Sequence, residues 1–364
     1  MKAGIVGLPN VGKSTLFNCL SNAKAQSANF PFCTIEPNIG VVNVPDPRLE
    51  KLESLVNPER VVPATVDIVD IAGLVKGASK GEGLGNQFLG NIRECNAIIH
   101  VLRCFDNDNI VHVDGNVNPV RDKETIDIEL QLKDLETVEK RLEKVSRAAK
   151  TGNKEAQVEQ GLLNRIREAL LQAKSARTVE PNGNDEEVLM QDFQLITTKP
   201  VLYVCNVDEG SAVNGNKYVE QIRELVKEER AEVIVLAVGT EADITELETY
   251  EERQMFLEDL GLKEPGASVL IRAAYKLLNQ QTYFTAGVKE VRAWTVGIGN
   301  TAPQAAGVIH TDFEKGFIRA EVIAYDDYVQ YGTEAKVKEA GKFRVEGKEY
   351  IVRDGDVMHF RFNV

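Results

Sequence analysis

The feature that most constrains this chain is a glycine-containing loop close to its start. Residues Gly7 to Ser14 read Gly-Leu-Pro-Asn-Val-Gly-Lys-Ser, which matches the pattern G-x-x-x-x-G-K-[ST]. In such a loop the glycines let backbone N–H groups face phosphate oxygens, and the following helix directs its positive end at the anion. The strand-like run Ala3 to Val6 precedes the loop, and the helical stretch Lys13 to Asn22 follows it. This context predicts a P-loop nucleotide-binding domain.

The residues of the loop predict individual roles at a nucleoside triphosphate. We expect Lys13 to reach the β- and γ-phosphates and to act catalytically, and the Ser14 hydroxyl to be a ligand of Mg²⁺. Backbone groups around these residues would contact the same phosphates. The predicted phosphate-binding residues of the loop are Asn10, Val11, Gly12, Lys13, Ser14 and Thr15.

A second motif, Asp70-Ile71-Ala72-Gly73, ends another predicted strand. After a P-loop, this pattern places the carboxylate of Asp70 in the Mg²⁺ shell and the N–H of Gly73 at the γ-phosphate. Thr34 lies between the two motifs, where a switch threonine would ligate Mg²⁺ and sense the γ-phosphate. From spacing alone, an ordinary loop threonine is an equal alternative.

The choice of base depends on a motif after a later strand. GTPases carry Asn-Lys-x-Asp there, and this chain has Asn206-Val207-Asp208-Glu209. The lysine is replaced by Val207, and the guanine-reading carboxylate is replaced by the longer Glu209. A displaced carboxylate pairs poorly with guanine, whereas Asn206 and backbone groups can read adenine. We therefore expect ATP, and a loosened guanine site is the alternative.

The residues that follow Asp70 to Gly73 affect turnover. Related enzymes place glutamine directly after this motif to orient water, but here the residue is Leu74. Another group must then position water, or intrinsic hydrolysis is slow. The glycine-rich stretch Gly77 to Gly90 is expected to form either a mobile switch or a plain flexible loop.

Apolar runs alternate with helical stretches, which predicts an α/β fold with a parallel sheet. Between Thr125 and Lys174 apolar residues recur at helical spacing on both sides of the turn Thr151-Gly152-Asn153. We read this as an antiparallel two-helix arm, which includes Ile128 in its apolar seam and extends to Ala173. A polar loop is expected over Thr178 to Glu187. From near Leu278 the pattern changes to a small α+β module.

The composition excludes several classes of protein. There is no run of about 18 apolar residues, so no transmembrane helix is expected. The five cysteines are scattered, which favours reduced thiols in a cytoplasmic protein. The net charge of −13 argues against general binding of nucleic acid by overall charge. The segment Ile128 to Lys174 is slightly basic, and it is either a local basic face or an ordinary solvated helical surface.

Taken together, these motifs resemble the YchF/Obg-like ATPase family. The resemblance rests on the runs Gly4 to Thr15, Asn29 to Asn38, Asp70 to Ala78 and Asn206 to Glu209. The segments Thr282 to Thr295 and His310 to Ala320 are similar to the TGS domain of that family. The resemblance to the family covers essentially the whole chain. The segment Val238-Gly239-Thr240 departs from the Ser-Ala or Ala-Ala pair that relatives often have at the base-binding loop.

The resemblance implies a Ras-like P-loop domain over residues 1–276, interrupted by a helical coiled-coil insertion at about 125–195. It also implies a TGS domain of β-grasp type over 278–362. Mg²⁺ would lie at Ser14 and Thr34, and adenine would meet Asn206 and the backbone of Val207. A histidine in the stretch Phe105 to Val113 is implicated in hydrolysis, which here is His112. The residues alone favour a structural histidine, since nothing local pairs with it.

The same resemblance extends to partners. Asn10 is similar to the asparagine that holds K⁺ in potassium-dependent relatives, and Leu74 fits the family's hydrophobic residue in place of glutamine. The expected function is a Mg²⁺-dependent, cytoplasmic, monomeric ATPase switch. It would bind the ribosome or RNA and act in translation or stress responses. The alternatives are a GTPase with relaxed base choice and a nucleotide-loaded scaffold with negligible turnover.

Overall fold

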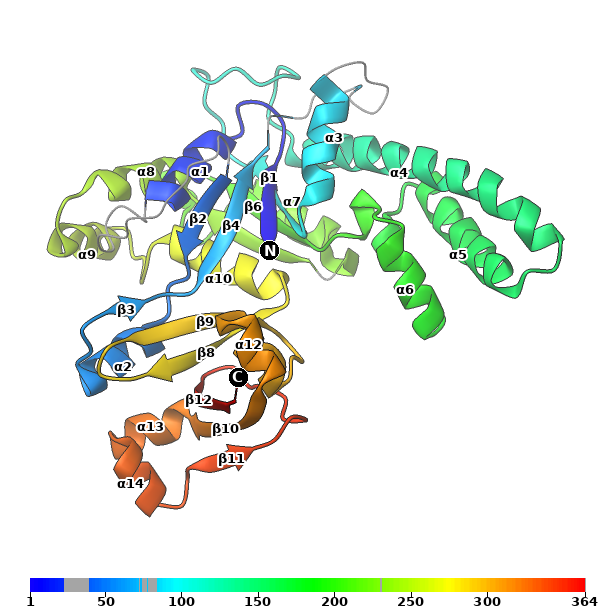
Figure 1. Cartoon of the computed structure of the whole chain (residues 1–364). Coiled ribbons are helices and arrows are strands. Elements are labelled where there is room, and N and C mark those ends of the chain that lie inside the picture. The colour runs from blue at the N-terminus through cyan, green and yellow to red at the C-terminus, as the bar shows by residue number, and fades with distance from the viewer. Residues whose placement is uncertain (23–38, 72, 74–76, 78–83, 230, 364) are drawn as a thin grey trace. The chain divides into compact units, whose positions relative to one another are not determined.

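The computed structural model describes residues 1–22, 39–71, 73, 77, 84–229 and 231–363 (Figure 1). Contacts within the chain divide it into two compact units. The first comprises Met1–Gly40 and Asp67–Leu270, and the second comprises Val41–Val66 and Ile271–Val364. The sequence predicted the boundary between the two domains at residues 276–278. The contacts place this boundary a few residues earlier and assign Val41–Val66 to the C-terminal unit.

The first unit is built on a largely parallel sheet with the strand order β2-β4-β1-β5-β6-β7. Strands β4, β1, β5, β6 and β7 are joined by parallel pairings, and β1 and β5 are buried along nearly their whole length. Continuous apolar strands of this kind need cover on both faces. The strands are β1 (Lys2–Val6), β2 (Ile39–Asn43), β4 (Thr65–Asp70), β5 (Ala97–Arg103), β6 (Val201–Asn206) and β7 (Glu232–Leu236).

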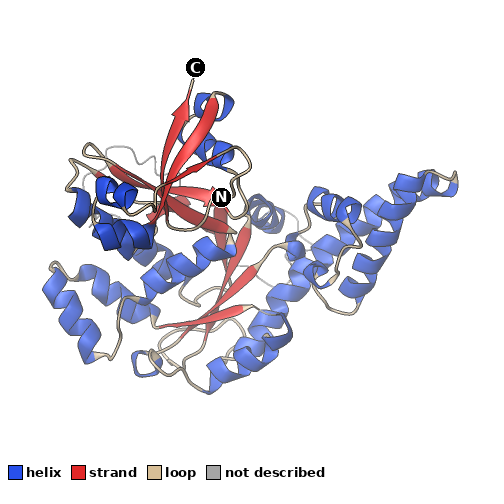
Figure 2. Ribbon diagram, turned by 90° about the horizontal axis from the view of Figure 1, so that it is seen from below, coloured by secondary structure: helices blue, strands red, loops and turns tan. Residues whose placement is uncertain are grey.

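Helices flank this sheet on both sides (Figure 2). Because parallel crossovers are right-handed, the helix after β1 lies on the face opposite to those that link β4, β5, β6 and β7. Helix α1 accordingly packs against α8, and α4 packs against α7. The helices other than the arm are α1 (Lys13–Asn22), α3 (Leu84–Glu94), α7 (Lys217–Leu225), α8 (Val238–Glu246), α9 (Tyr250–Asp259) and α10 (Gly266–Leu277), with 3-10 turns η4 (Glu209–Ser211) and η5 (Lys227–Glu229).

The predicted arm is formed by α4 (Pro119–Lys150) and α5 (Lys154–Leu171), which lie side by side (Figure 1). Asn153 caps α5 by accepting a hydrogen bond from the N–H of Ala156 at 3.0 Å. The arm has its own apolar core. Three short elements lie next to this core: the 3-10 turns η2 (Ala176–Thr178) and η3 (Ile196–Thr198), and helix α6 (Asn184–Asp192). The buried members of that core are Val138, Val145, Ala149, Ala156, Leu162, Leu163, Ile166, Leu170, Ala176, Phe193 and Leu195.

Four local predictions in this unit are wrong in whole or in part. Ile128 is half exposed, because the α4 face that meets the sheet is formed by residues such as Ile126 and Leu130. Ala173 lies beyond the end of α5 with φ of 56°, a left-handed conformation that ends the helix. The polar stretch Thr178 to Glu187 is not wholly a loop, since α6 begins at Asn184, and the glycine-rich stretch becomes helical at Leu84.

The second unit is a mixed sheet with the order β11-β10-β12-β8-β9-β3. An antiparallel hairpin of β8 and β9 is followed by a helix, and the last strand returns parallel to β8, as expected for a β-grasp fold. Tyr283, Ala305, Val322 and Phe360 belong to its core. The elements are α2 (Pro47–Val56), β3 (Val61–Val62), β8 (Gln280–Ala286), β9 (Val291–Gly297), α11 (Ala302–Ile309), α12 (Thr311–Lys315), β10 (Phe317–Ala324), α13 (Tyr325–Tyr331), α14 (Glu334–Glu339), β11 (Arg344–Glu346) and β12 (Asp356–Phe362).

The segment 41–66 joins this unit through specific contacts. Strand β3 pairs with β9, with Val61 opposite Val291. Arg48 of α2 donates to Asp354 at 2.8 Å and lies over the ring of Phe284. Pairings over more than 200 residues leave no local pattern in the sequence. Among the described residues, no helix is both long enough and apolar enough to cross a membrane.

Candidate nucleotide-binding site

The P-loop connects β1 to α1 and has the geometry that its sequence predicts. Asn10 and Gly12 both have positive φ, 62° and 99°, which turn the backbone around the phosphate position. The Nζ of Lys13 is largely buried and donates to the carbonyl of Leu8 at 2.7 Å. Burial lowers the pKa of Lys13 to about 8, against the opposing effect of the Asp70 charge. The lysine is thus held within the loop by a carbonyl that a phosphate would replace.

Ser14 and Asp70 meet beside this loop. The Ser14 hydroxyl donates to Oδ2 of Asp70 at 3.2 Å, whereas Oδ1 of Asp70 is buried with no hydrogen-bond partner among the described residues. Burial raises the pKa of the Asp70 carboxyl, while Ser14 and Lys13 act in the opposite direction. A buried carboxylate oxygen with no partner, next to a serine hydroxyl, is a donor set that fits Mg²⁺.

Gly73 lies against the same lysine. A Cβ added at Gly73 would be 3.2 Å from Nζ of Lys13 and 3.2 Å from the backbone nitrogen of Pro9. The Asp-x-x-Gly motif therefore closes on the phosphate loop from the β4 side. Two other residues of the prediction, Thr34 and Leu74, lie outside the described residues, so their predicted roles stay predictions.

Asn206 joins the P-loop to the start of α8. Its amide nitrogen donates to the carbonyl of Val11 at 2.9 Å, and its amide oxygen accepts from the N–H of Val238 at 3.1 Å. The side chain is buried. Both ends of the amide are thus engaged by the protein, so the observed role of Asn206 is to hold two loops of the site together. Its predicted contact with adenine is an additional role that stays a prediction.

A cavity of about 570 Å³ opens beside these two loops. That volume lies in the range of sites for small ligands. Its walls come from the P-loop, from the segment after β5, from the end of β6 and from the start of α8. The lining residues include Asn10, Val11, Gly12, Thr15, Phe105, Asp106, Asn107, Ile110, Val207, Glu209, Val238 and Asp243.

The end of β6 differs in two residues from the Asn-Lys-x-Asp motif of a guanine site. Asp208 caps η4, and its Oδ1 accepts from both the N–H and the hydroxyl of Ser211 at 3.1 Å. Glu209 is the first residue of that turn and is exposed. Val207 is buried at the cavity wall and has no charge to offer. This edge of the cavity therefore lacks the lysine of a guanine site and has the longer Glu209 where such a site has aspartate.

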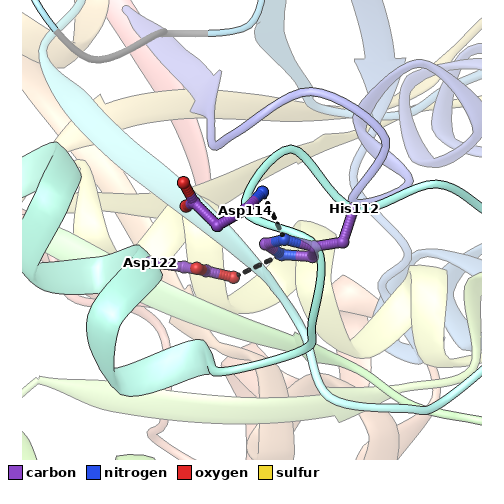
Figure 3. Close-up of side chains that lie close together, drawn as sticks. All are labelled: His112, Asp114 and Asp122. Atoms are coloured by element: carbon purple, nitrogen blue, oxygen red, sulfur yellow. Dashed lines mark hydrogen bonds and ion pairs between the residues drawn. The ribbon is translucent and has the colours of Figure 1, made fainter.

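The residues near His112 in the sequence had indicated a histidine without partners, but the structure gives it two. Its Nε2 lies 2.8 Å from Oδ2 of Asp122 at the start of α4, and its Nδ1 accepts from the N–H of Asp114 at 3.1 Å (Figure 3). His112, Asp114 and Asp122 have the residue types of a metal site. However, the guanidinium of Arg121 already pairs with both carboxylates. Arg121 supplies the positive charge that a metal would bring.

The His112 segment also contacts the phosphate loop. The amide nitrogen of Asn10 donates to the carbonyl of Val111 at 3.2 Å. The backbone next to His112 is therefore tied to the P-loop, although the two lie about 100 residues apart in the sequence. Sequence reasoning did not find Asp122, Phe105 or Arg103 as site residues. A signal was available for Arg103, because a charged side chain ends strand β5, whose other residues apart from His100 are apolar.

Comparisons with known proteins show which family the chain resembles. A family model described as a 50S ribosome-binding GTPase matches residues 2–146, and the model YchF-GTPase_C, described as a protein of unknown function, matches residues 280–363. The chain is 59% identical to the ribosome-binding ATPase YchF of Haemophilus ducreyi, over 100% of this chain and 99% of that protein.

The chain belongs to the YchF family. It is 57% identical to the ribosome-binding ATPase YchF of Bacillus subtilis over 100% of both chains. The solved structure of the Schizosaccharomyces pombe YchF GTPase superimposes with a TM-score of 0.90 at 39% identity, covering 99% of this chain and 97% of that one. The predicted family and fold class are thereby confirmed.

Membership of the YchF family makes the chain a P-loop nucleotide hydrolase. The names of these relatives differ on the nucleotide, since the bacterial proteins are named ATPases and the yeast protein is named a GTPase.

Proposed function

We propose that this chain is a Mg²⁺-dependent ATPase that acts as a nucleotide-controlled switch and binds the ribosome. The observation that carries the choice of ATP is the end of β6, where Val207 replaces lysine and the longer, exposed Glu209 stands at the position of the guanine-reading aspartate. A guanine base in this cavity would leave its N–H edges without a well-placed carboxylate. Buried polar groups left unpaired discriminate strongly between substrates.

Competition for nucleotide tests this choice. Binding of a fluorescent ATP analogue is measured against unlabelled ATP and GTP, and turnover is measured with each. We expect ATP to compete more strongly, by on the order of tenfold or more. The double variant Val207→Lys, Glu209→Asp restores Asn-Lys-x-Asp and should shift the preference towards GTP. A wild-type preference for GTP would contradict the proposal.

Mg²⁺ would be held by Ser14 and Asp70, with Thr34 as the further predicted ligand. When bound, the ion neutralises charge that develops on the phosphoryl group during transfer. Lys13 adds a second positive charge at the same phosphates. Hydrolysis should therefore stop when EDTA removes divalent ions and return when Mg²⁺ is added. A Ser14→Ala protein should need more Mg²⁺ for half-maximal turnover than the wild type needs.

We also propose that His112 helps to orient the attacking water, since Leu74 cannot do so. Support comes from the neighbouring carbonyl of Val111, which is tied to Asn10 of the P-loop. His112→Ala should lower kcat by about 10²-fold, the typical contribution of one acid–base group, with little change in the Kd for ATP. His310→Ala is the control, because His310 is exposed in the second unit. Normal turnover by His112→Ala would remove this residue from the mechanism.

A ribosome partner is proposed because the bacterial relatives are named ribosome-binding ATPases. The arm offers a surface for the RNA of such a partner, since Lys140 and Lys144 are exposed on it. Co-sedimentation with ribosomal subunits should depend on whether ATP or ADP is bound. Lys140→Glu with Lys144→Glu should weaken it, most at low salt, because salt already screens the contacts of these lysines with phosphates. Lys263→Glu, an exposed lysine outside the arm, should not.

A nucleotide-loaded scaffold is the second candidate. The observation that favours it is that both ring nitrogens of His112 are engaged by Asp122 and Asp114. Single-turnover kinetics with and without ribosomes separate the two. A switch shows faster hydrolysis with its partner, whereas a scaffold holds ATP unhydrolysed in both conditions.

A K⁺ ion at Asn10 is tested in the same assay by replacing K⁺ with Na⁺.

A further inference from the structure

Arg103 is a buried cation whose partners among the described residues are carbonyl oxygens. It ends strand β5 with an exposed fraction of 1%. Its Nη1 donates to the carbonyl of Ile110 at 2.9 Å, its Nη2 to Asn107 at 3.0 Å and its Nε to Phe105 at 3.2 Å. The guanidinium carbon also lies 4.9 Å from the centroid of the Phe105 ring. One side chain thus binds three points of one loop.

That loop, residues 105–110, forms one wall of the cavity beside the P-loop. Phe105, Asn107 and Ile110 all line the cavity. Residues 104–118 lie outside any helix or strand, so their backbone groups have no regular ladder to satisfy them. Backbone carbonyls that leave water need donors from elsewhere. Arg103 supplies three of them from the side of the sheet.

We propose that Arg103 is a positioning residue for the nucleoside part of the nucleotide. Its guanidinium holds loop 105–110 in the shape that forms the cavity wall before any ligand binds. This inference rests on the proposed function, because it takes the cavity to be the nucleoside site. Arg103 has no role in the phosphate chemistry, but by this proposal it affects the affinity for the nucleotide.

The chemistry explains why the residue is an arginine. A guanidinium has five N–H donors spread in a rigid plane, so it can reach three carbonyls at once. A lysine ammonium is a compact point charge on a flexible stem and cannot reproduce that spread. If the loop is ordered only part of the time, the apparent Kd rises in inverse proportion to the ordered fraction. The phosphate loop, which is tied by Asn206, should be much less affected.

The test compares Arg103→Lys with Arg141→Lys in the full-length chain. Arg141 is a matched control, since it also stacks on a phenylalanine, with its guanidinium carbon 4.5 Å from the Phe193 ring, but lies on the arm. We expect Arg103→Lys to raise the Kd for ATP by on the order of tenfold. Tripolyphosphate, which has no nucleoside, should compete within about twofold of its wild-type strength. Arg141→Lys should leave both values unchanged.

Amide hydrogen exchange of the nucleotide-free protein gives a second readout. Segment 105–111 should exchange faster in Arg103→Lys, while the P-loop and the arm keep wild-type rates. Arg103→Met serves as a second variant because it fills the space without burying an unpaired charge. Unchanged exchange of 105–111 together with unchanged ATP binding in both variants would overturn the proposal. If the wild type binds no ATP, the proposed function fails, but the exchange result still decides whether Arg103 orders the loop.

Discussion

His112 and Asp122 are joined by a hydrogen bond of 2.8 Å between Nε2 and Oδ2, and both side chains are almost fully buried. The other ring nitrogen, Nδ1, accepts from the backbone N–H of Asp114 at 3.1 Å. A nitrogen that accepts a hydrogen bond carries no proton, so Nε2 must be the donor to Asp122. The geometry therefore assigns the ring proton to Nε2.

Nuclear magnetic resonance should confirm this tautomer. In protein with ¹⁵N-labelled histidine, the His112 ring should show a protonated Nε2 and an unprotonated Nδ1, with the signal assigned by its loss in His112→Gln. Asp122→Asn should keep the tautomer, since an amide oxygen still accepts from Nε2. Asp122→Leu should lose it and destabilise the fold by about 1–3 kcal/mol, the cost of leaving a buried donor unpaired. A protonated Nδ1 in the wild type would contradict the geometry.

Gly12→Ala should abolish nucleotide binding with little loss of overall fold. Gly12 has φ of 99°, and a Cβ there would lie 2.5 Å from Nδ2 of Asn206. The added methyl group displaces the amide that joins Val11 to Val238, so the P-loop loses its support. The measurement is ATP binding by calorimetry, beside the far-ultraviolet circular dichroism spectrum.

Gly161→Ala is the control for that substitution. Gly161 lies within α5, and nothing is within 4 Å of an added Cβ. Alanine in place of glycine inside a helix should stabilise the fold by about 0.5–1 kcal/mol and leave ATP binding unchanged. If Gly12→Ala binds ATP like Gly161→Ala, the loop does not depend on the Asn206 contact.

Much of the fold could be predicted because local pattern and tertiary structure agree. The helix predicted over Lys13 to Asn22 has the same bounds in the structure, and the strand-like run Ala3 to Val6 lies within β1. The membership of the segment Val41–Val66 in the second unit could not be predicted from local pattern. That membership depends on pairs such as Val61 with Val291, which are separated by 230 residues in the chain.

The site could be predicted only as far as its motifs extend. Lys13, Ser14 and Asp70 follow from the phosphate and Mg²⁺ chemistry and lie close together. Arg103 and Asp122 belong to no motif, because their roles arise from where β5 and α4 end and begin. Asn206 was expected at the base, and the structure shows that its amide first holds the two loops together.

Asp134→Ala should be one of the most destabilising substitutions in the arm. Asp134 is fully buried on α4 and accepts from the N–H groups of Ile196 and Thr197 at 2.8 and 2.7 Å. Its carboxylate also accepts from the Thr197 hydroxyl at 2.6 Å. Three buried donors without an acceptor should cost about 3–5 kcal/mol, measured by urea unfolding.

Glu136→Ala on the same helix is the comparison for Asp134→Ala. Glu136 has a side chain that is 41% exposed, and it pairs with Lys133 and Lys140. Exposed pairs of this kind contribute little, so the free energy of unfolding should change by less than about 1 kcal/mol. Equal effects of the two substitutions would show that the Asp134 contacts do not anchor the arm.

His100 should make the fold less stable in mild acid. It is buried in β5 with its ring 5.5 Å from that of Tyr203, and its Nε2 has no partner among the described residues. Burial lowers the pKa of His100 to about 3, helped by the positive charges of Lys123, Arg177 and Lys13. The unfolded chain has an ordinary histidine pKa of about 6.5 and so binds the proton first.

The sign of the effect follows from that difference in proton binding. Stability from a neutral His100 is present above about pH 6.5 and is lost as the pH falls towards 3. Between pH 7 and pH 5 this histidine alone should lower the free energy of unfolding by about 2 kcal/mol. His100→Phe keeps an aromatic ring against Tyr203 and cannot take up a proton, so it should lose about 2 kcal/mol less over the same interval. Urea unfolding at both pH values measures this, and an equal loss in the two proteins would mean that His100 is not the group that titrates.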